Sequence, residues 1–249
     1  MTIGNEDDLE GIRRVGRVVA DTLLSMRRAV APGITTRELD EIGAEVIRTA
    51  GARSAPHLVY GFPGVNLISV NDEVVHGIPG SRRIEPGDVV KLDVTAEMNG
   101  YITDAAETAL LPPASAIAAR MQRCSVAAFS KGATAARVGR PVRAIGAAVE
   151  RKVRDCGFHV LRELSGHGVG RTIHEPPTIP NYDAAFATQR LTRGMVITIE
   201  PLISMSPTDS FTAADGWTIR TRDGSLSAHY EHTIIVWESG PEIVTRVTR

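Results

Sequence analysis

Two aspartates lie in a segment that alternates like a β-hairpin. Residues 89–95 are rich in β-branched side chains, and Asn99-Gly100 is a strong signal for a two-residue turn. Such a turn pairs Thr95 with Asp104, so Asp93 and Asp104 become diagonal neighbours roughly 7–8 Å apart. Carboxylates at that separation could converge on two cations about 3.5–4 Å apart. A solvated sheet face carrying two ordinary acids alternates in the same way, so the hairpin alone leaves both interpretations open.

Two glutamates occupy comparable places in the second half of the chain. Glu200 follows the apolar run 194–199 and precedes Pro201, where a strand end could present it. Glu231 lies just before four β-branched residues, so a central strand there would bury it. A buried carboxylate is paired or binds a metal. The structural alternatives are a capping role for Glu200 and an arginine salt bridge for Glu231.

Three histidines could join these acids. His167 and His174 frame a glycine-rich stretch whose backbone can approach a ligand closely, but the stretch lacks the Lys-Ser/Thr of a phosphate loop. His76 ends a strand-like run, where a hydrogen-bonded structural histidine is the common case. Carboxylates with histidine and no thiolate suit Mn, Fe(II), Co or Zn in a reactive site, and do not suit a structural zinc.

The elements that must position these residues follow a repeated order. Helical periodicity covers 8–26, and Thr35-x-x-Glu38 is a capping box that opens a helix ending near Gly51. Strands follow to Asp104, then helices, then strands that flank a second hairpin signal at Asp223-Gly224. The later helices are expected over 115–131 and 141–156. This order predicts an α+β fold with helices on one face of an antiparallel sheet, weakly duplicated about residue 112.

Composition excludes several classes of protein. The 249 residues carry 28 basic and 29 acidic side chains, so the net charge of −1 offers no general field for nucleic acid or an anionic membrane. The two cysteines cannot form a disulfide framework or a four-thiolate zinc site. No long apolar run or secretory leader is visible. We therefore expect a cytoplasmic globular protein that binds neither nucleic acid nor membranes.

Taken together, the motifs resemble the type I methionine aminopeptidases, which have the pita-bread metallopeptidase fold. The resemblance runs from about Leu9 to Val247 and rests on seven segments: 71–79, 91–95, 100–104, 166–177, 198–201, 217–219 and 230–233. It implies one catalytic domain over 1–249, with halves about 1–112 and 113–249. It also implies an antiparallel sheet with helices on its outer face.

The resemblance further implies a site of two divalent ions, whether Co, Mn, Fe(II) or Zn. Asp104 and Glu231 would bridge both ions, Asp93 would bind one, and His167 and Glu200 the other. His174 would stabilise the oxyanion, and His76 would contact the scissile amide or stabilise the intermediate. Both histidines would thus be catalytic residues that touch the substrate. Glu200 would also shuttle the proton.

The specificity pocket departs from the family pattern. Val59 replaces the usual Tyr, Leu67 the usual Cys and Ile173 the common Phe, whereas Phe62 and Trp217 keep their places. All five are expected to contact the substrate in a pocket that remains apolar. His229 is a further departure, because glutamine is common there. His229 could form a hydrogen bond that supports one of the metal ligands, or it could make an accessory contact with metal or substrate.

Removal of the initiator methionine from nascent chains and peptides is the leading functional hypothesis. An aminopeptidase with a shifted preference for the first residue is the second, motivated by the altered pocket. The third is a non-catalytic peptide-binding module, which the intact ligand set disfavours. We expect a monomer with N-terminal peptides as substrates, and the sequence leaves a contact with the ribosome open.

Overall fold

The computed structural model describes residues 1–246 and is built around one nine-stranded sheet. The last residues of the expected domain, and the end of the resemblance at Val247, lie outside the described residues. Seven strands run in the order β1-β4-β5-β14-β9-β7-β8, while β2 pairs with β4 and β15 with β14, all in antiparallel pairs. The bounds are β1 Arg53–Ser54, β2 Leu67–Val70, β4 Val89–Met98, β5 Tyr101–Leu110, β7 Ser165–Gly168, β8 Glu175–Pro180, β9 Val196–Ile199, β14 Glu231–Ile235 and β15 Glu242–Ile243.

Five helices accompany the sheet. They are α1 Glu6–Ala29, α2 Thr36–Thr49, α3 Ala55–Tyr60, α4 Ala116–Ala135 and α5 Arg143–Asp155. Four of them match expected helices, and the capping box of Thr35 and Glu38 is confirmed at the start of α2. The short helix α3 was not expected. It begins after Ser54, whose hydroxyl accepts from the N–H of His57, and ends at the left-handed Gly61.

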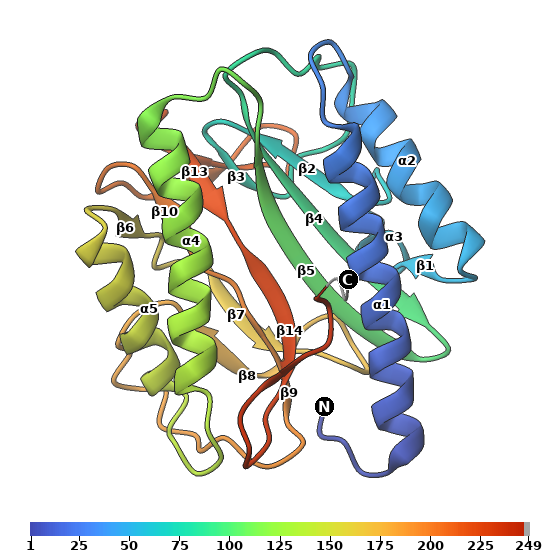
Figure 1. Ribbon diagram of the computed structural model, residues 1–249, viewed down its shortest axis with the longest axis vertical. Helices are drawn as coiled ribbons and strands as arrows, with labels where there is room; N and C mark the ends of the chain where they lie inside the picture. Colours follow the sequence, from blue (N-terminus) through green and yellow to red (C-terminus); the bar gives the residue numbers. More distant parts are fainter. Residues whose placement is uncertain (247–249) are drawn as a thin grey trace.

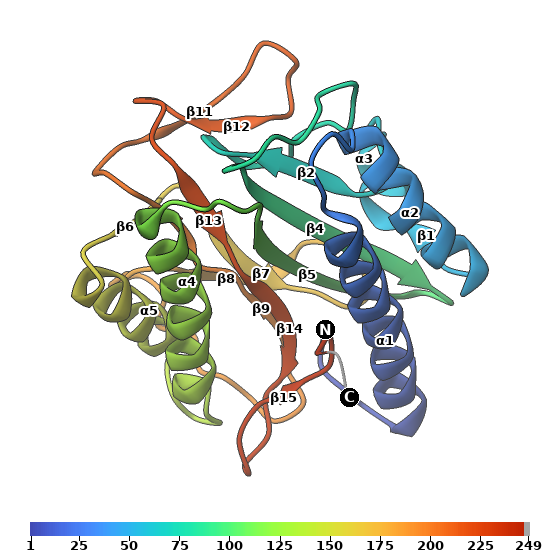
Figure 2. The ribbon, with the colours of Figure 1, turned by 45° about the horizontal axis from the view of Figure 1, so that its top comes forward.

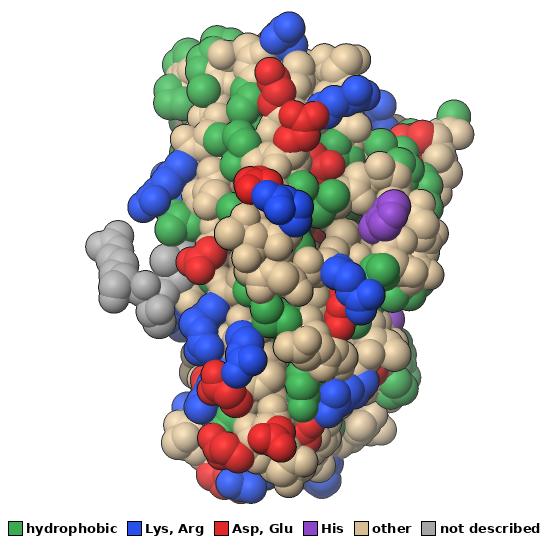
Figure 3. All heavy atoms as spheres, turned by 90° about the vertical axis from the view of Figure 1, so that its right-hand side faces the viewer, with side chains coloured by type: hydrophobic (Ala, Val, Ile, Leu, Met, Phe, Trp, Pro, Cys, Tyr) green, Lys and Arg blue, Asp and Glu red, His purple; other side chains and the backbone are tan. Residues whose placement is uncertain are grey.

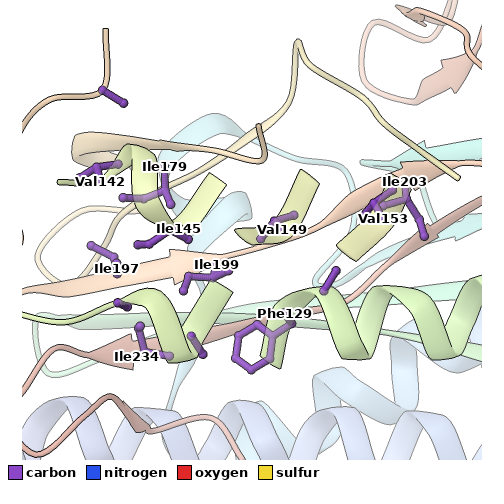
Figure 4. Packing of buried hydrophobic residues seen from close by; sticks show 14 of the residues in the cluster. Phe129, Val142, Ile145, Val149, Val153, Ile179, Ile197, Ile199, Ile203 and Ile234 are labelled. Atoms are coloured by element: carbon purple, nitrogen blue, oxygen red, sulfur yellow. The ribbon is translucent and has the colours of Figure 1, made fainter. Parts of the chain in front are cut away.

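The helices form two pairs against the sheet, one in each half of the chain. Apolar residues of α1 and α2 pack with Val90, Leu92 and Val94 of β4. Those of α4 and α5 pack with Ile197 and Ile199 of β9 and Ile234 of β14, as the close-up in Figure 4 shows. Figure 1 shows α1 and α2 to the right of β5 and β14, and α4 and α5 to their left; Figure 2 shows the same two pairs from a second direction. The expected α+β class, an antiparallel sheet with helices outside it, is confirmed.

The β4–β5 hairpin has the predicted register. Asn99 and Gly100 both have positive φ, as a tight hairpin turn requires, and Thr95 pairs with Asp104. Because Val90, Leu92 and Val94 face the helices, Asp93 and its neighbours along the strand face the other side. That side is also buried: Lys91, Asp93 and Thr95 are all shielded from solvent. The interpretation of this face as a solvated one is therefore wrong.

Two small sheets lie beside the main one. The first has the order β13-β10-β6 and the second β11-β12-β3. Their bounds are β3 Glu73–Val75, β6 His159–Val160, β10 Leu202–Ser204, β11 Ser210–Thr212, β12 Ile219–Thr221 and β13 Ser227–His229.

The prediction of a second hairpin at Asp223-Gly224 is wrong. The strand β12 pairs with β11 and β3, whereas β13 pairs with β10. The run 225–236 is not one strand either, because it breaks at Tyr230 and passes from a small sheet into the main sheet. Pairing with strands distant in sequence overrides the local turn signal here.

The described surface carries charges of both signs. Figure 3 shows acidic and basic side chains interspersed over the face that α1 and α2 border. No helix within residues 1–246 combines the length and the apolar run that a bilayer crossing would need.

One close backbone contact yields a stability prediction. A Cβ at Gly146 in α5 would lie 2.1 Å from the carbonyl oxygen of Tyr182 and 2.4 Å from that of Pro180. Gly146→Ala should lower the free energy of unfolding by about 1–3 kcal/mol through overpacking, although alanine favours helix by about 1 kcal/mol. Arg151→Ala, at an exposed position of the same helix, should stay within about 0.5 kcal/mol of wild type. Urea denaturation measures both, and equal stability of the two variants would show that this contact does not constrain α5.

Candidate metal centre and substrate cavity

Acidic and histidine side chains gather in one cavity of about 450 Å³ on the side of the sheet away from the helices. Its lining includes all seven residues expected to bind metal or to be catalytic: His76, Asp93, Asp104, His167, His174, Glu200 and Glu231. Apolar contacts come from Val75, Leu164 and Leu202. The structure therefore brings together side chains that are spread over more than half of the sequence.

Five neighbouring strands position the five expected metal ligands. In sheet order, β4 carries Asp93, β5 Asp104, β14 Glu231 and β7 His167, while Glu200 follows directly after β9. The register also leaves space between the acids. Ala106 of β5 pairs with Asp93 of β4 on one side and with Glu231 of β14 on the other. The small side chain of Ala106 fills little of the gap between these carboxylates.

The ligand atoms fall into two groups that share one residue. Atoms of Asp104, His167 and Glu231 lie within 4.8 Å of one another, and so do atoms of Asp93, His229 and Glu231. The His167 Nε2 atom is 3.5 Å from Glu200 Oε1 and 3.9 Å from Asp104 Oδ2. A carboxylate common to two groups is the arrangement that two adjacent cations require.

These carboxylates lack the partners that buried acids normally have. Asp93 Oδ1, Asp104 Oδ1 and Glu231 Oε1 are buried without a hydrogen-bond partner. Within residues 1–246 the ion pairs of this cluster involve histidines and no lysine or arginine. The arginine salt bridge considered for Glu231 is therefore absent from this part of the chain. Oxygen atoms left open in this way, with imidazole beside them, fit divalent transition-metal ions.

Burial and mutual repulsion raise the pKa values of the acids. Burial is the largest cause for Asp93, Asp104 and Glu200, and the charges of neighbouring carboxylates raise their pKa values further. Burial raises the pKa of Glu231 to about 8. Burial, with the charge of His174 next, lowers the pKa of His167 to about 4, so its ring is neutral and able to ligate. Without a cation, the cluster must hold protons near neutral pH.

Two threonines hold the ligand residues in place, and sequence reasoning missed both. The Thr233 hydroxyl accepts from the Asp104 N–H at 2.9 Å and donates to the Asp104 carbonyl at 2.8 Å. The Thr198 hydroxyl accepts from the His167 N–H at 3.0 Å and donates to Glu200 Oε1 at 3.1 Å. Thr198 and Thr233 lie in the motif segments 198–201 and 230–233, but nothing in those segments indicated that their hydroxyls hold neighbouring ligand residues.

His174 and His76 lie in the cavity beside the acids. The His174 ring is 4.3 Å from that of His167, and its Nδ1 atom is 2.6 Å from the Tyr60 hydroxyl. The sequence did not predict this role of Tyr60, because its partner His174 lies 114 positions away in the chain. His76 has a left-handed φ of 61°, a strained conformation for a residue with a Cβ. Burial, with the charges of His229 and His174, lowers the pKa of His76 to about 4.

None of the five expected pocket residues is among the residues that line this cavity. Phe62 is buried and meets Trp217 edge-to-face at 5.3 Å. Leu67 pairs with Asp93 across β2 and β4. Val59 is 51% exposed on α3, and Ile173 is buried in a separate apolar cluster. Their roles in substrate binding remain predictions.

Comparisons with known proteins place the chain in a family and confirm the fold. A sequence profile of metallopeptidase family M24 matches residues 10–238. The chain is 41% identical to methionine aminopeptidase 2 of Bacillus subtilis, over 99% of this chain and 100% of that protein. It is 40% identical to methionine aminopeptidase of Clostridium perfringens, over 98% of both. The crystal structure of methionine aminopeptidase from Thermotoga maritima superposes with a TM-score of 0.96 at 32% identity, covering 99% of this chain and 100% of that one.

Fold, site and relatives together define a metallopeptidase, and the chain belongs to metallopeptidase family M24. Within that family, these full-length relatives and the T. maritima structure are all methionine aminopeptidases. The expected resemblance to that group is confirmed.

The raised pKa of Glu231 predicts a distinctive pH dependence. A carboxyl with a raised pKa stabilises the fold at low pH, and that contribution is lost as the pH rises from about 4.5 to about 8. In metal-free protein, the free energy of unfolding of Glu231→Gln should therefore increase relative to that of wild type as the pH rises through this range. Excess Mn(II) should reverse the sign at the upper end, because the variant loses a ligand.

Chemical denaturation across this pH range measures the effect. Glu41→Gln, at an exposed position on α2, is the matched control and should follow wild type at every pH. A constant difference between Glu231→Gln and wild type would contradict a pKa of Glu231 that burial raises.

Proposed function

We propose that this chain removes the N-terminal methionine from peptides and nascent proteins with the help of two divalent ions. The observation that carries the proposal is the sharing of Glu231 by two groups of ligand atoms in one cavity. Membership of family M24 and similarity to methionine aminopeptidases over the whole chain support it.

Five side chains would hold the ions: Asp93, Asp104, His167, Glu200 and Glu231. The unpartnered oxygens of Asp93, Asp104 and Glu231 are suited to this role. When bound, two such ions polarise the scissile carbonyl and make the attacking water more acidic.

Tyr60 prepares His174 to stabilise the oxyanion. Burial raises the pKa of the Tyr60 phenol, which therefore keeps its proton and donates a hydrogen bond to Nδ1 of His174. The ring then carries its own proton on Nε2. Burial also lowers the pKa of His174, so the ring is neutral. Its Nε2–H is free to donate to the carbonyl oxygen as negative charge develops there.

Glu200 and His76 would serve the remaining steps. Burial and the charges of three neighbouring carboxylates raise the pKa of Glu200, which suits a group that takes a proton from water and returns it to the leaving amine. His76 lies in the same cavity and would contact the scissile amide nitrogen. Its strained backbone is the kind of feature found at sites that hold one side chain in place for function.

The first side chain of the substrate would contact apolar groups near Phe62 and Trp217. Burying a methionine side chain contributes roughly 1.5–3 kcal/mol. One observation favours the second candidate, a shifted preference for that residue. Val59, a small aliphatic residue, adjoins Tyr60 in the chain, and the Tyr60 hydroxyl contacts His174.

The chain would act as one catalytic domain over 1–249, with related halves about 1–112 and 113–249. Each half contributes a helix pair to the structure. We propose a cytoplasmic monomer that acts on the N-termini of peptides and nascent chains, and a contact with the ribosome stays open.

Peptide hydrolysis tests the proposal. Metal-free protein, titrated with Mn(II), Co(II), Fe(II) and Zn(II), should cleave Met-Ala-Ser and lose this activity with chelator. Asp104→Asn should retain less than about a tenth of wild-type turnover in excess metal, because a bridging ligand loses its charge. Cleavage of Met-Ala-Ser no faster than Leu-Ala-Ser would replace the leading function by the shifted preference. Failure to bind any metal would refute both.

His174→Ala tests the oxyanion role separately from the metal site. The expected loss is roughly 10²–10³ in kcat with metal content unchanged, because one donor to the developing charge is removed. His159→Ala, at an exposed position, is the control and should leave kcat unaltered. Loss of bound metal from His174→Ala would show that His174 is a ligand and not a substrate contact.

A further inference from the structure

His229 is fixed at the edge of the acidic cluster by its own backbone. It is the last residue of β13, and its N–H donates to the Thr108 hydroxyl at 3.0 Å. That hydroxyl in turn donates to the His229 carbonyl at 2.8 Å. The Thr108 side chain of β5 thus binds both the backbone N–H and the carbonyl of His229, and this fixes the backbone that carries the ring.

The ring itself is buried without partners. His229 is 1% exposed, and neither of its ring nitrogens has a hydrogen-bond partner within residues 1–246. Buried side-chain polar atoms nearly always have such a partner. The Nε2 atom lies 3.2 Å from Glu231 Oε2, but the two are not aligned for a hydrogen bond. The arrangement leaves a ring nitrogen facing carboxylate oxygens.

A cation bound between the ring nitrogen and the carboxylate oxygens would give these buried atoms a partner. Ligand atoms of Asp93, His229 and Glu231 lie within 4.8 Å of one another. Asp93 Oδ1 and Glu231 Oε1 are also buried and unpartnered. These three residues thus combine ligand atoms that lie close together with side chains that have unpartnered polar atoms.

We propose that His229 is a sixth metal-ligating side chain, which binds the ion held by Asp93 and Glu231 through a ring nitrogen. The inference rests on the proposed two-metal function and adds to its ligand set. Each of the two ions would then have one imidazole, from His167 or from His229. The added nitrogen ligand should shift the Asp93 site away from Mn(II) and toward Fe(II), Co(II) or Zn(II).

The competing role is a hydrogen bond from His229 to Glu231 with no contact to metal. Glutamine separates the two roles, because its amide can donate a hydrogen bond but ligates these ions poorly. His229→Gln is therefore the informative variant. His159→Gln, at an exposed histidine, is the matched control.

Proton NMR of the full chain loaded with Co(II) reads out ligation directly. A histidine bound to Co(II) gives a strongly shifted, solvent-exchangeable ring N–H signal. His167 is expected to give one such signal, since its Nδ1 faces the Gly168 carbonyl at 2.9 Å and leaves Nε2 for the metal. We expect two signals from wild type and from His159→Gln, and one from His229→Gln. Calorimetric titration should show metal binding weakened at least about tenfold at one site in His229→Gln alone.

A wild-type spectrum with two bound ions and only one such signal would overturn the inference and leave the proposed function intact. A protein that binds no divalent ion would refute the proposed function itself. Unchanged signals and affinities in His229→Gln would assign His229 to the hydrogen-bonding role. If near-ultraviolet circular dichroism shows that this variant does not fold, the number of signals from wild type decides the question alone.

Discussion

Repulsion among four buried carboxylates is the constraint on which the rest of this structure depends. Asp93, Asp104, Glu200 and Glu231 converge in one cavity away from solvent. Burying an unpaired charge is strongly unfavourable, so such a cluster must take up protons or bind cations. The raised pKa values of the four carboxyls correspond to proton uptake. The proposed ions would take the place of these protons. The folded state therefore carries a site that is costly when empty and gains stability when filled.

The scaffold resists this repulsion through ordinary sheet geometry. Strand alternation sends apolar side chains toward the helices and acids toward the cavity, so the same strands anchor the core and present the ligands. Ala106 keeps the space between Asp93 and Glu231 open. Hydroxyls of Thr198 and Thr233 then fix the adjacent backbone and one carboxylate. A ligand set drawn from rigid neighbouring strands changes little when metal binds, and this preorganisation favours catalysis.

Local sequence signals predicted the local parts of this arrangement. The Asn99-Gly100 turn set the register that makes Asp93 and Asp104 neighbours, and Thr35 with Glu38 marked the start of α2. The burial of Lys91, Asp93 and Thr95 could not be predicted from the sequence of β4 alone, because segments distant in the chain cover this face of the strand. The same limit explains the error at Asp223-Gly224, where β12 and β13 find partners elsewhere. Tyr60 was missed since its contact with His174 spans 114 positions of the chain.

The central claim is that the acidic cluster exists to hold two cations and is protonated without them. Calorimetric titration of metal-free protein with Mn(II) near neutral pH, repeated in buffers with different heats of ionisation, tests it most directly. The account predicts two ions per chain and a net release of protons on binding, because carboxyls with raised pKa values give up their protons to the metal. Binding of a single ion, or of two ions without proton release, would contradict it.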